Sequence, residues 1–180
     1  GPNSLHGGVR GFNKFVWRAQ SFQRADSVGL TFVRTSLDGE DGYPGNLKVT
    51  VTYTLTDSNE VIFDYRATTD KATPINLTQH SYFNLADGGS SSIVSHVMKI
   101  NADSFTPVDS TQIPTGEIRS VTGTPFDFRT PITIGARIDS DDEQLKIGMG
   151  YDHNFVLRKD SASATGNDTV VKMTLAAAVY

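Results

Sequence analysis

One ten-residue stretch, 76–85, gathers hydrogen-bonding and aromatic side chains around a histidine. It reads Asn-Leu-Thr-Gln-His-Ser-Tyr-Phe-Asn-Leu, and as a strand it would carry Thr78, His80, Tyr82 and Asn84 on one face. An imidazole, a phenol and an amide in one row suit a site that holds a sugar, whose hydroxyls need hydrogen-bond partners and whose C–H face needs a flat apolar surface. The same row is also typical of the solvent face of a half-buried strand, so both interpretations stay open.

A second histidine, His6, stands at the edge of a glycine-rich turn that spans residues 6–12. Its three glycines let the backbone take positive φ values and let another group approach closely. A phosphate-binding loop is disfavoured, because neither a lysine followed by serine or threonine nor the start of a helix comes next. The alternative is a glycine-rich loop in which the histidine is incidental.

The third candidate segment, 148–157, leads through glycines into Asp152 and His153 and then continues as a strand. Neighbouring side chains on a regular strand point to opposite faces, so Asp152 and His153 cannot both serve one site there. We therefore expect one of the two to be structural.

Alternating patterns predict the strands that must position these residues. The clearest is 47–56, where apolar residues alternate with threonines and a lysine, and 61–67 repeats the alternation after a turn, which predicts a hairpin. Further strands are expected at 15–19, 28–35, 76–85, 96–100, after His153 and at 171–179. One or two helical turns are expected at 131–138, an irregular surface run at 106–117 and a charged loop at 139–143. Short strands separated by turn signals predict an all-β sandwich.

Composition excludes several classes of function. The 180 residues suit one domain, and a net charge of −4 with scattered basic residues favours neither nucleic acid nor an anionic membrane as a partner. The absence of cysteine excludes disulfides and thiolate metal sites, and no apolar stretch is long enough to span a bilayer. The acidic loop 38–45 lacks the spacing of an EF-hand, so we expect no metal.

Three motifs carry a resemblance to a known family. They are Leu-His-Gly-Gly at 5–8 with Gly11, Phe12 and Trp17, the stretch 76–85, and Gly-Tyr-Asp-His-Asn-Phe at 150–155. In order and spacing they resemble the aldose 1-epimerases, the galactose mutarotases, over the whole chain. The resemblance implies a large antiparallel β-sandwich, the mutarotase-like supersandwich, with the sugar in an open cleft on one sheet. It also implies an isomerase that interconverts the α and β anomers of galactose or glucose without metal or cofactor.

By this resemblance, His80 is the general acid and His6 is the second catalytic histidine, near the ring oxygen. Both would also bind the sugar, together with Tyr82 and Asp152, whereas His153 is not carried over. The family's glutamate base lies in a segment that would follow Tyr180, and its sugar-binding arginine would precede Gly1; Arg10 does not match that arginine. We therefore expect a single partial domain over 1–180 that missing segments or a second chain complete, and little activity for this chain alone.

Two other functions remain open. The first is a carbohydrate-binding module of the same fold that has lost catalysis, although the presence of both histidines favours the enzyme. The second is a hexose-6-phosphate epimerase, which would need arginines around the site for the phosphate, and the arginines here do not cluster near the motifs. The compartment is left open: relatives are often cytoplasmic, and the sequence is also compatible with secretion.

Overall fold

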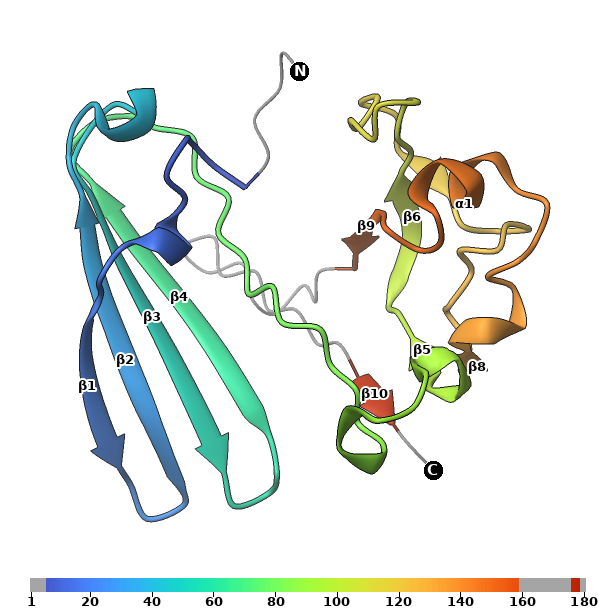
Figure 1. Cartoon of the computed structure of the whole chain (residues 1–180), viewed down its shortest axis with the longest axis horizontal. Coiled ribbons are helices and arrows are strands. Elements are labelled where there is room, and N and C mark those ends of the chain that lie inside the picture. Colours follow the sequence, from blue (N-terminus) through green and yellow to red (C-terminus); the bar gives the residue numbers. More distant parts are fainter. Residues whose placement is uncertain (1–5, 159–175, 179–180) are drawn as a thin grey trace. The chain divides into compact units, whose positions relative to one another are not determined.

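One antiparallel sheet organises the first half of the chain (Figure 1). The computed structural model describes residues 6–158 and the backbone of residues 176–178. The sheet has the order β1-β2-β3-β4, formed by Arg18–Gln23, Ser27–Ser36, Leu47–Thr56 and Val61–Thr69. The strands predicted at 28–35, 47–56 and 61–67 are confirmed, and β3 and β4 form the predicted hairpin, in which Leu55 pairs with Val61.

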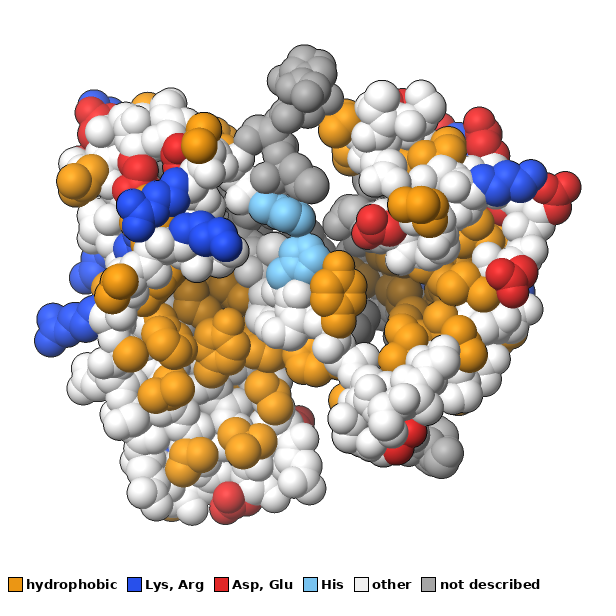
Figure 2. All heavy atoms as spheres, viewed as in Figure 1, with side chains coloured by type: hydrophobic (Ala, Val, Ile, Leu, Met, Phe, Trp, Pro, Cys, Tyr) orange, Lys and Arg blue, Asp and Glu red, His pale blue; other side chains and the backbone are white. Residues whose placement is uncertain are grey.

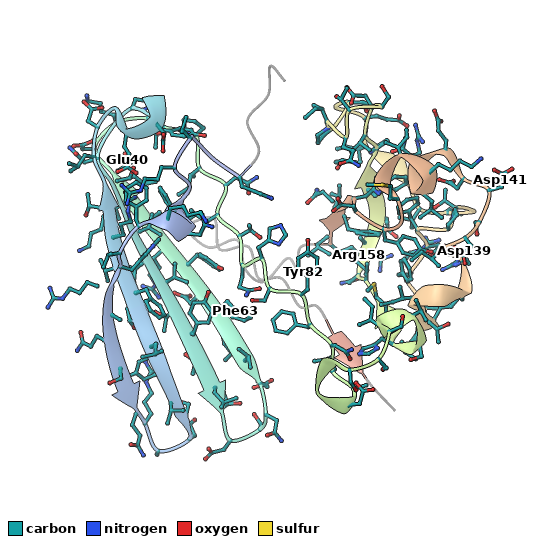
Figure 3. All side chains as sticks on the ribbon, viewed as in Figure 1. Glu40, Phe63, Tyr82, Asp139, Asp141 and Arg158 are labelled. Atoms are coloured by element: carbon teal, nitrogen blue, oxygen red, sulfur yellow. The ribbon has the colours of Figure 1, made fainter. Side chains whose placement is uncertain are left out.

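The two faces of this sheet differ as the sequence pattern requires. On one face Val49 and Val51 are buried, and the rings of Phe32, Tyr53 and Phe63 form a row across β2, β3 and β4. Phe63 is labelled in Figure 3. The other face of β3 carries threonines and Lys48, because consecutive side chains of a strand point to opposite sides. The apolar face therefore supplies the packing surface of this sheet.

The short strand predicted at 15–19 is wrong over 15–17 and is confirmed only at Arg18 and Ala19, where β1 begins. Phe12–Lys14 forms a 3₁₀ turn, η1, and β1 begins only at Arg18. Trp17 is half-buried and its Nε1 donates to the carbonyl of Phe12 at 2.9 Å, which folds the segment back on itself. A side chain to backbone hydrogen bond of this kind competes with strand pairing.

The second half of the chain contains two small antiparallel sheets, with the orders β10-β5-β8 and β7-β6-β9. Their strands are β5 (Val97–Lys99), β6 (Ala102–Thr106), β7 (Arg119–Ser120), β8 (Ile132–Thr133), β9 (Asn154–Leu157) and β10 (Ala176–Ala178). The strands expected near 96–100 and after His153 are confirmed as β5 and β9. The strand expected at 171–179 is confirmed only at β10, and its other residues lie outside the described ones.

Aromatic side chains form the core of this second half. One cluster consists of Phe105, Val121, Phe126 and Leu145, and the other of Ile100, Ala102 and Phe128. Phe105 and Phe126 stack with their ring centroids 4.4 Å apart. Tyr151 and Phe155 pack against both clusters. Tyr151, the residue before Asp152, therefore packs against the core.

Several loop predictions need correction. The six-residue helix α1 (Glu143–Gly148) begins within the expected charged loop, and the Asp142 side chain caps it by accepting from the backbone N–H groups of Gln144 and Leu145. Of the one or two helical turns expected at 131–138, one forms, the 3₁₀ turn η5 (Ile134–Ala136), and it follows the short strand β8. In the irregular run 106–117, Pro107 and Val108 are buried, so it is only partly a surface run. The remaining 3₁₀ turns are η2 (Glu40–Gly42), η3 (Asp87–Gly89) and η4 (Ile93–Ser95).

The strand predicted at 76–85 is also wrong, since this segment belongs to no sheet (Figure 1). Side chains bind its backbone instead: Gln79 Oε1 accepts from Ser81 N–H, and the His96 ring accepts from Leu85 N–H. Alternation indicates that side chains suit a strand, but a strand also needs a neighbour with free N–H and C=O groups.

Gly1–Ser81 and Tyr82–Tyr180 each form a compact unit. The single domain expected over 1–180 stays a prediction. Within the described ranges, 6–158 and 176–178, the protein has no helix with the length and apolar character needed to cross a bilayer.

Candidate functional site

The structure brings the two candidate catalytic histidines together. The rings of His6 and His80 meet edge to face, with centroids 4.9 Å apart and planes at 89°. Both side chains are exposed, and Figure 2 shows imidazoles, in pale blue, side by side at the surface. Two segments far apart in the sequence thus present two groups that can exchange protons with one small ligand.

The backbone around His6 has an unusual conformation. His6 has φ = 62° and Gly7 has φ = 101°, both in the left-handed region that residues with a Cβ rarely adopt. An ideal Cβ on Gly8 would lie 2.2 Å from the Cβ of Asp41, so the next residue must be a glycine as well. Steric constraints therefore favour glycine at both positions that follow His6.

An ion pair, formed by Arg34 and Glu40, lies next to this turn. Arg34, on the apolar face of β2, donates from Nη2 to both carboxylate oxygens of Glu40 at 2.6 Å. Its guanidinium also lies 3.6 Å from the ring centroid of Phe15 and 4.8 Å from that of Phe12. Burial opposes the ionisation of Glu40, but hydrogen bonds from Arg34 and Ser36 outweigh it and lower the pKa of this carboxyl.

Arg34 and Glu40 were not among the site residues expected from the sequence. One signal could have found this pair, because Arg34 occupies an inward position of an alternating strand, after Val28, Leu30 and Phe32. A charge at such a position needs a partner, and Glu40 in the next turn supplies it.

The other two candidate site residues belong to the second unit. Tyr82 is 92% exposed, and Asp152 also has an exposed side chain. Asp152 immediately follows Tyr151, whose hydroxyl donates to the carbonyl of Pro125 at 3.2 Å and whose ring packs on Phe126 and Phe128. Burial raises the pKa of Tyr151. Asp152 is thus an exposed carboxylate next to an anchored core residue.

His153 is structural, as the opposite-face argument predicted for one member of the pair. Its ring packs edge to face on Phe126, and its Nε2 lies 3.2 Å from Oε1 of Gln144. Burial lowers the pKa of His153. Asp152 is exposed whereas His153 is half-buried, so the two side chains diverge.

His96 is structural as well. It is buried, and its Nε2 accepts from the backbone N–H of Leu85 at 3.0 Å. Asn84 fastens the same end of the segment by donating from Nδ2 to the carbonyl of Ser91. Within the second unit, residues 84 and 85 are therefore tied to Ser91 and His96.

Two of the three carboxylates of loop 38–45 have hydrogen-bond partners within the protein. Asp38 accepts from Lys71 and from the backbone N–H of Gly45, both of which lower its pKa, and Glu40 pairs with Arg34. Among the described residues, no group of three or more His, Cys, Asp or Glu side chains could hold a metal ion.

Residues 1–178 match the family model of aldose 1-epimerase. The chain belongs to the aldose 1-epimerase family. It is 54% identical to the galactose mutarotase of Sus scrofa over 159 residues and 47% identical to the aldose 1-epimerase of Escherichia coli (strain K12) over 158 residues. Each alignment covers 88% of this chain and 44% of the relative, so the chain spans less than half the length of these curated relatives.

Solved structures agree with this assignment. The galactose 1-epimerase of Lactobacillus acidophilus NCFM superposes with a TM-score of 0.79 at 34% identity, over 88% of this chain and 46% of that one. An aldose epimerase homologue from C. elegans superposes with a TM-score of 0.70 at 36% identity, with the same coverage. Together with the antiparallel strands, these neighbours confirm the predicted fold class, an all-β sandwich of the mutarotase type.

Proposed function

We propose that this chain supplies the histidine-bearing part of an aldose 1-epimerase that interconverts the α and β anomers of free aldoses such as galactose and glucose. The observation that carries the proposal is the edge-to-face pair of His6 and His80. Family membership and relatives that are galactose mutarotases and aldose 1-epimerases support it.

In the proposed reaction, a base removes the proton of the C1 hydroxyl while His80 protonates the ring oxygen. The C1–O bond to the ring oxygen breaks, the C1–C2 bond rotates, and the ring closes on the other face as the protons return. An imidazole suits the acid role because it gains and loses a proton near neutral pH. His6 assists at the ring oxygen, and Tyr82 and Asp152 hold sugar hydroxyls. The base implied by the family resemblance is a glutamate from a further C-terminal segment.

Two measurements test this proposal. In the first, saturation-transfer NMR detects binding of galactose and glucose by the 180-residue chain, and we expect His80→Ala and Asp152→Asn to weaken it. In the second, this chain replaces the aligned region of the Escherichia coli relative, and polarimetry follows freshly dissolved α-galactose. His80→Ala should slow the chimera by roughly a hundred- to ten-thousand-fold, the usual contribution of one acid or base. The exposed residue Lys48, changed to Ala, is the control.

The outcomes separate the candidate functions. An active chimera that His80→Ala inactivates supports the epimerase. Sugar binding by the chain combined with an inactive chimera favours a binding module without catalysis. Absence of both binding and activity contradicts the proposal.

A further inference from the structure

An ion pair between buried Arg34 and part-buried Glu40 links two segments that hold the turn of His6. The side chain of Arg34 is only 8% exposed and that of Glu40 is 20% exposed. Taking charges out of water is costly, and an apolar residue of similar volume often replaces a buried ion pair without loss of stability. Nη1 of Arg34 is buried without a hydrogen-bond partner among the described residues, so the pair is not a fully satisfied network. The presence of such a costly pair at this position points to a geometric role.

The first link runs from Arg34 to the segment that follows His6. The guanidinium contacts the rings of Phe12 and Phe15, and Arg10 also lies over Phe15, 4.2 Å from its centroid. The η1 turn between these rings is closed by Lys14 N–H, which donates to Gly11 at 2.9 Å. The end of the glycine-rich turn is thereby fixed to β2.

The second link runs through Glu40. This residue opens η2 in the loop between β2 and β3 (Figure 3), and it is bound by Arg34 and by the hydroxyl of Ser36. The next residue, Asp41, has φ = 48° and packs against Gly8 so closely that a Cβ would not fit there. The start of the glycine-rich turn is thereby held against the η2 loop.

Both links meet at Arg34. His6, which precedes Gly7 and Gly8, has a left-handed backbone conformation that a free chain would rarely adopt. We propose that Arg34, held by Glu40, is a positioning residue that keeps the His6 imidazole against His80. Arg34 does not contact the sugar in this proposal; it acts through the backbone of residues 8–15. A planar guanidinium that lies over two aromatic rings while its Nη2 binds both oxygens of a carboxylate suits this task better than lysine.

This inference depends on the proposed function only for the role that the pair of His6 and His80 would play. The test therefore uses geometry as its readout: the cross-peak between the His6 and His80 ring protons in NOE spectra of the histidine-labelled 180-residue chain. We expect Arg34→Met and Arg34→Lys to abolish this cross-peak and Glu40→Gln to weaken it. Amide exchange at Lys14 should become about tenfold faster, whereas amides of β3 keep their protection.

Arg66→Met is the matched control, because Arg66 forms an exposed ion pair with Asp64 on the same sheet. If Arg34→Met does not fold, the cross-peaks of Arg34→Lys and Glu40→Gln decide whether the positioning role holds. A cross-peak unchanged in Glu40→Gln and in every folded Arg34 variant overturns the positioning role. A cross-peak that disappears as expected, in a chain whose chimera shows no epimerase activity, upholds the positioning role and contradicts the proposed function.

Discussion

Nε2 of His153 lies 3.2 Å from Oε1 of Gln144, and that same oxygen accepts from the backbone N–H of Val108 at 2.7 Å. Because Oε1 can only accept, neutral His153 carries its proton on Nε2 and leaves Nδ1 bare. Nδ1 is buried without a partner among the described residues, so a second proton would have no acceptor. This agrees with the lowered pKa of His153, for which burial is the largest cause.

The first prediction is that acid weakens the fold through His153. An unfolded histidine titrates near pH ~6.5 and the folded one below it, so the unfolded state binds more protons between these values. The free energy of unfolding should therefore fall as the pH decreases from about 7 through 6. Urea unfolding at several pH values checks this in the wild type and in His153→Gln. An equal slope of unfolding free energy against pH in both proteins would show that His153 is not the cause.

The second prediction concerns Gln144, which is buried and binds both backbone groups of Val108. Gln144→Leu leaves a buried N–H and a buried C=O without partners, which should cost roughly 2–4 kcal/mol of unfolding free energy. Chemical denaturation measures the loss. Gln112→Leu is the control, since its single side-chain bond is exposed and its loss should cost less than about 1 kcal/mol.

The third prediction concerns the ion pair of Asp127 and Arg129. The Arg129 side chain is the main cause that lowers the pKa of Asp127 to about 2. A carboxylate with a lowered pKa stabilises the fold above its unfolded pKa of ~3.9, and this contribution is lost as the pH falls through about 2. Asp127→Asn should therefore cost about 1 kcal/mol at neutral pH, after allowance for solvent screening, and almost nothing near pH ~2. Thermal unfolding across this range tests it, with exposed Asp57→Asn as the control.

The fourth prediction concerns Gly29 in β2. An ideal Cβ there would lie 2.3 Å from the carbonyl oxygen of Tyr53 and 2.3 Å from Cζ of Phe22. Gly29→Ala should lower the unfolding free energy by about 1–3 kcal/mol, because the Tyr53 backbone cannot move without disturbing the sheet. Thr31→Ala, on the same face of β2, is the control. Full rescue by Phe22→Ala would show that only the side-chain contact matters.

The fifth prediction is that His96 protects the backbone of Leu85. His96→Phe removes the acceptor of the Leu85 N–H, and a lost hydrogen bond worth about 1–2 kcal/mol corresponds to roughly tenfold faster exchange. Hydrogen exchange of the Leu85 amide measures this effect. The Ser81 amide, which Gln79 binds, serves as the internal reference and should not change. Unchanged protection at Leu85 would contradict the role of His96.

Much of the fold could be predicted from periodicity. The period of two in 28–35, 47–56 and 61–67 indicated β2, β3 and β4, because a half-buried antiparallel strand needs that alternation. The same reasoning failed at 76–85, where side chains of Gln79 and His96 bind backbone groups that a neighbouring strand would otherwise pair. It also missed α1, since six residues are too few to show a helical period.

Sequence alone determined three of the four strands of the first sheet, the family and the identity of the candidate histidines, because these depend on local pattern and residue type. Tertiary structure decided that the rings of His6 and His80 meet edge to face and that Arg34 and Glu40 form an ion pair. It also decided that His96 and His153 are structural. Those relationships join residues at separations from six positions, in Arg34 and Glu40, to 74 positions, in His6 and His80. They depend on packing and on which buried polar groups find partners, and neither is encoded in the spacing of a motif.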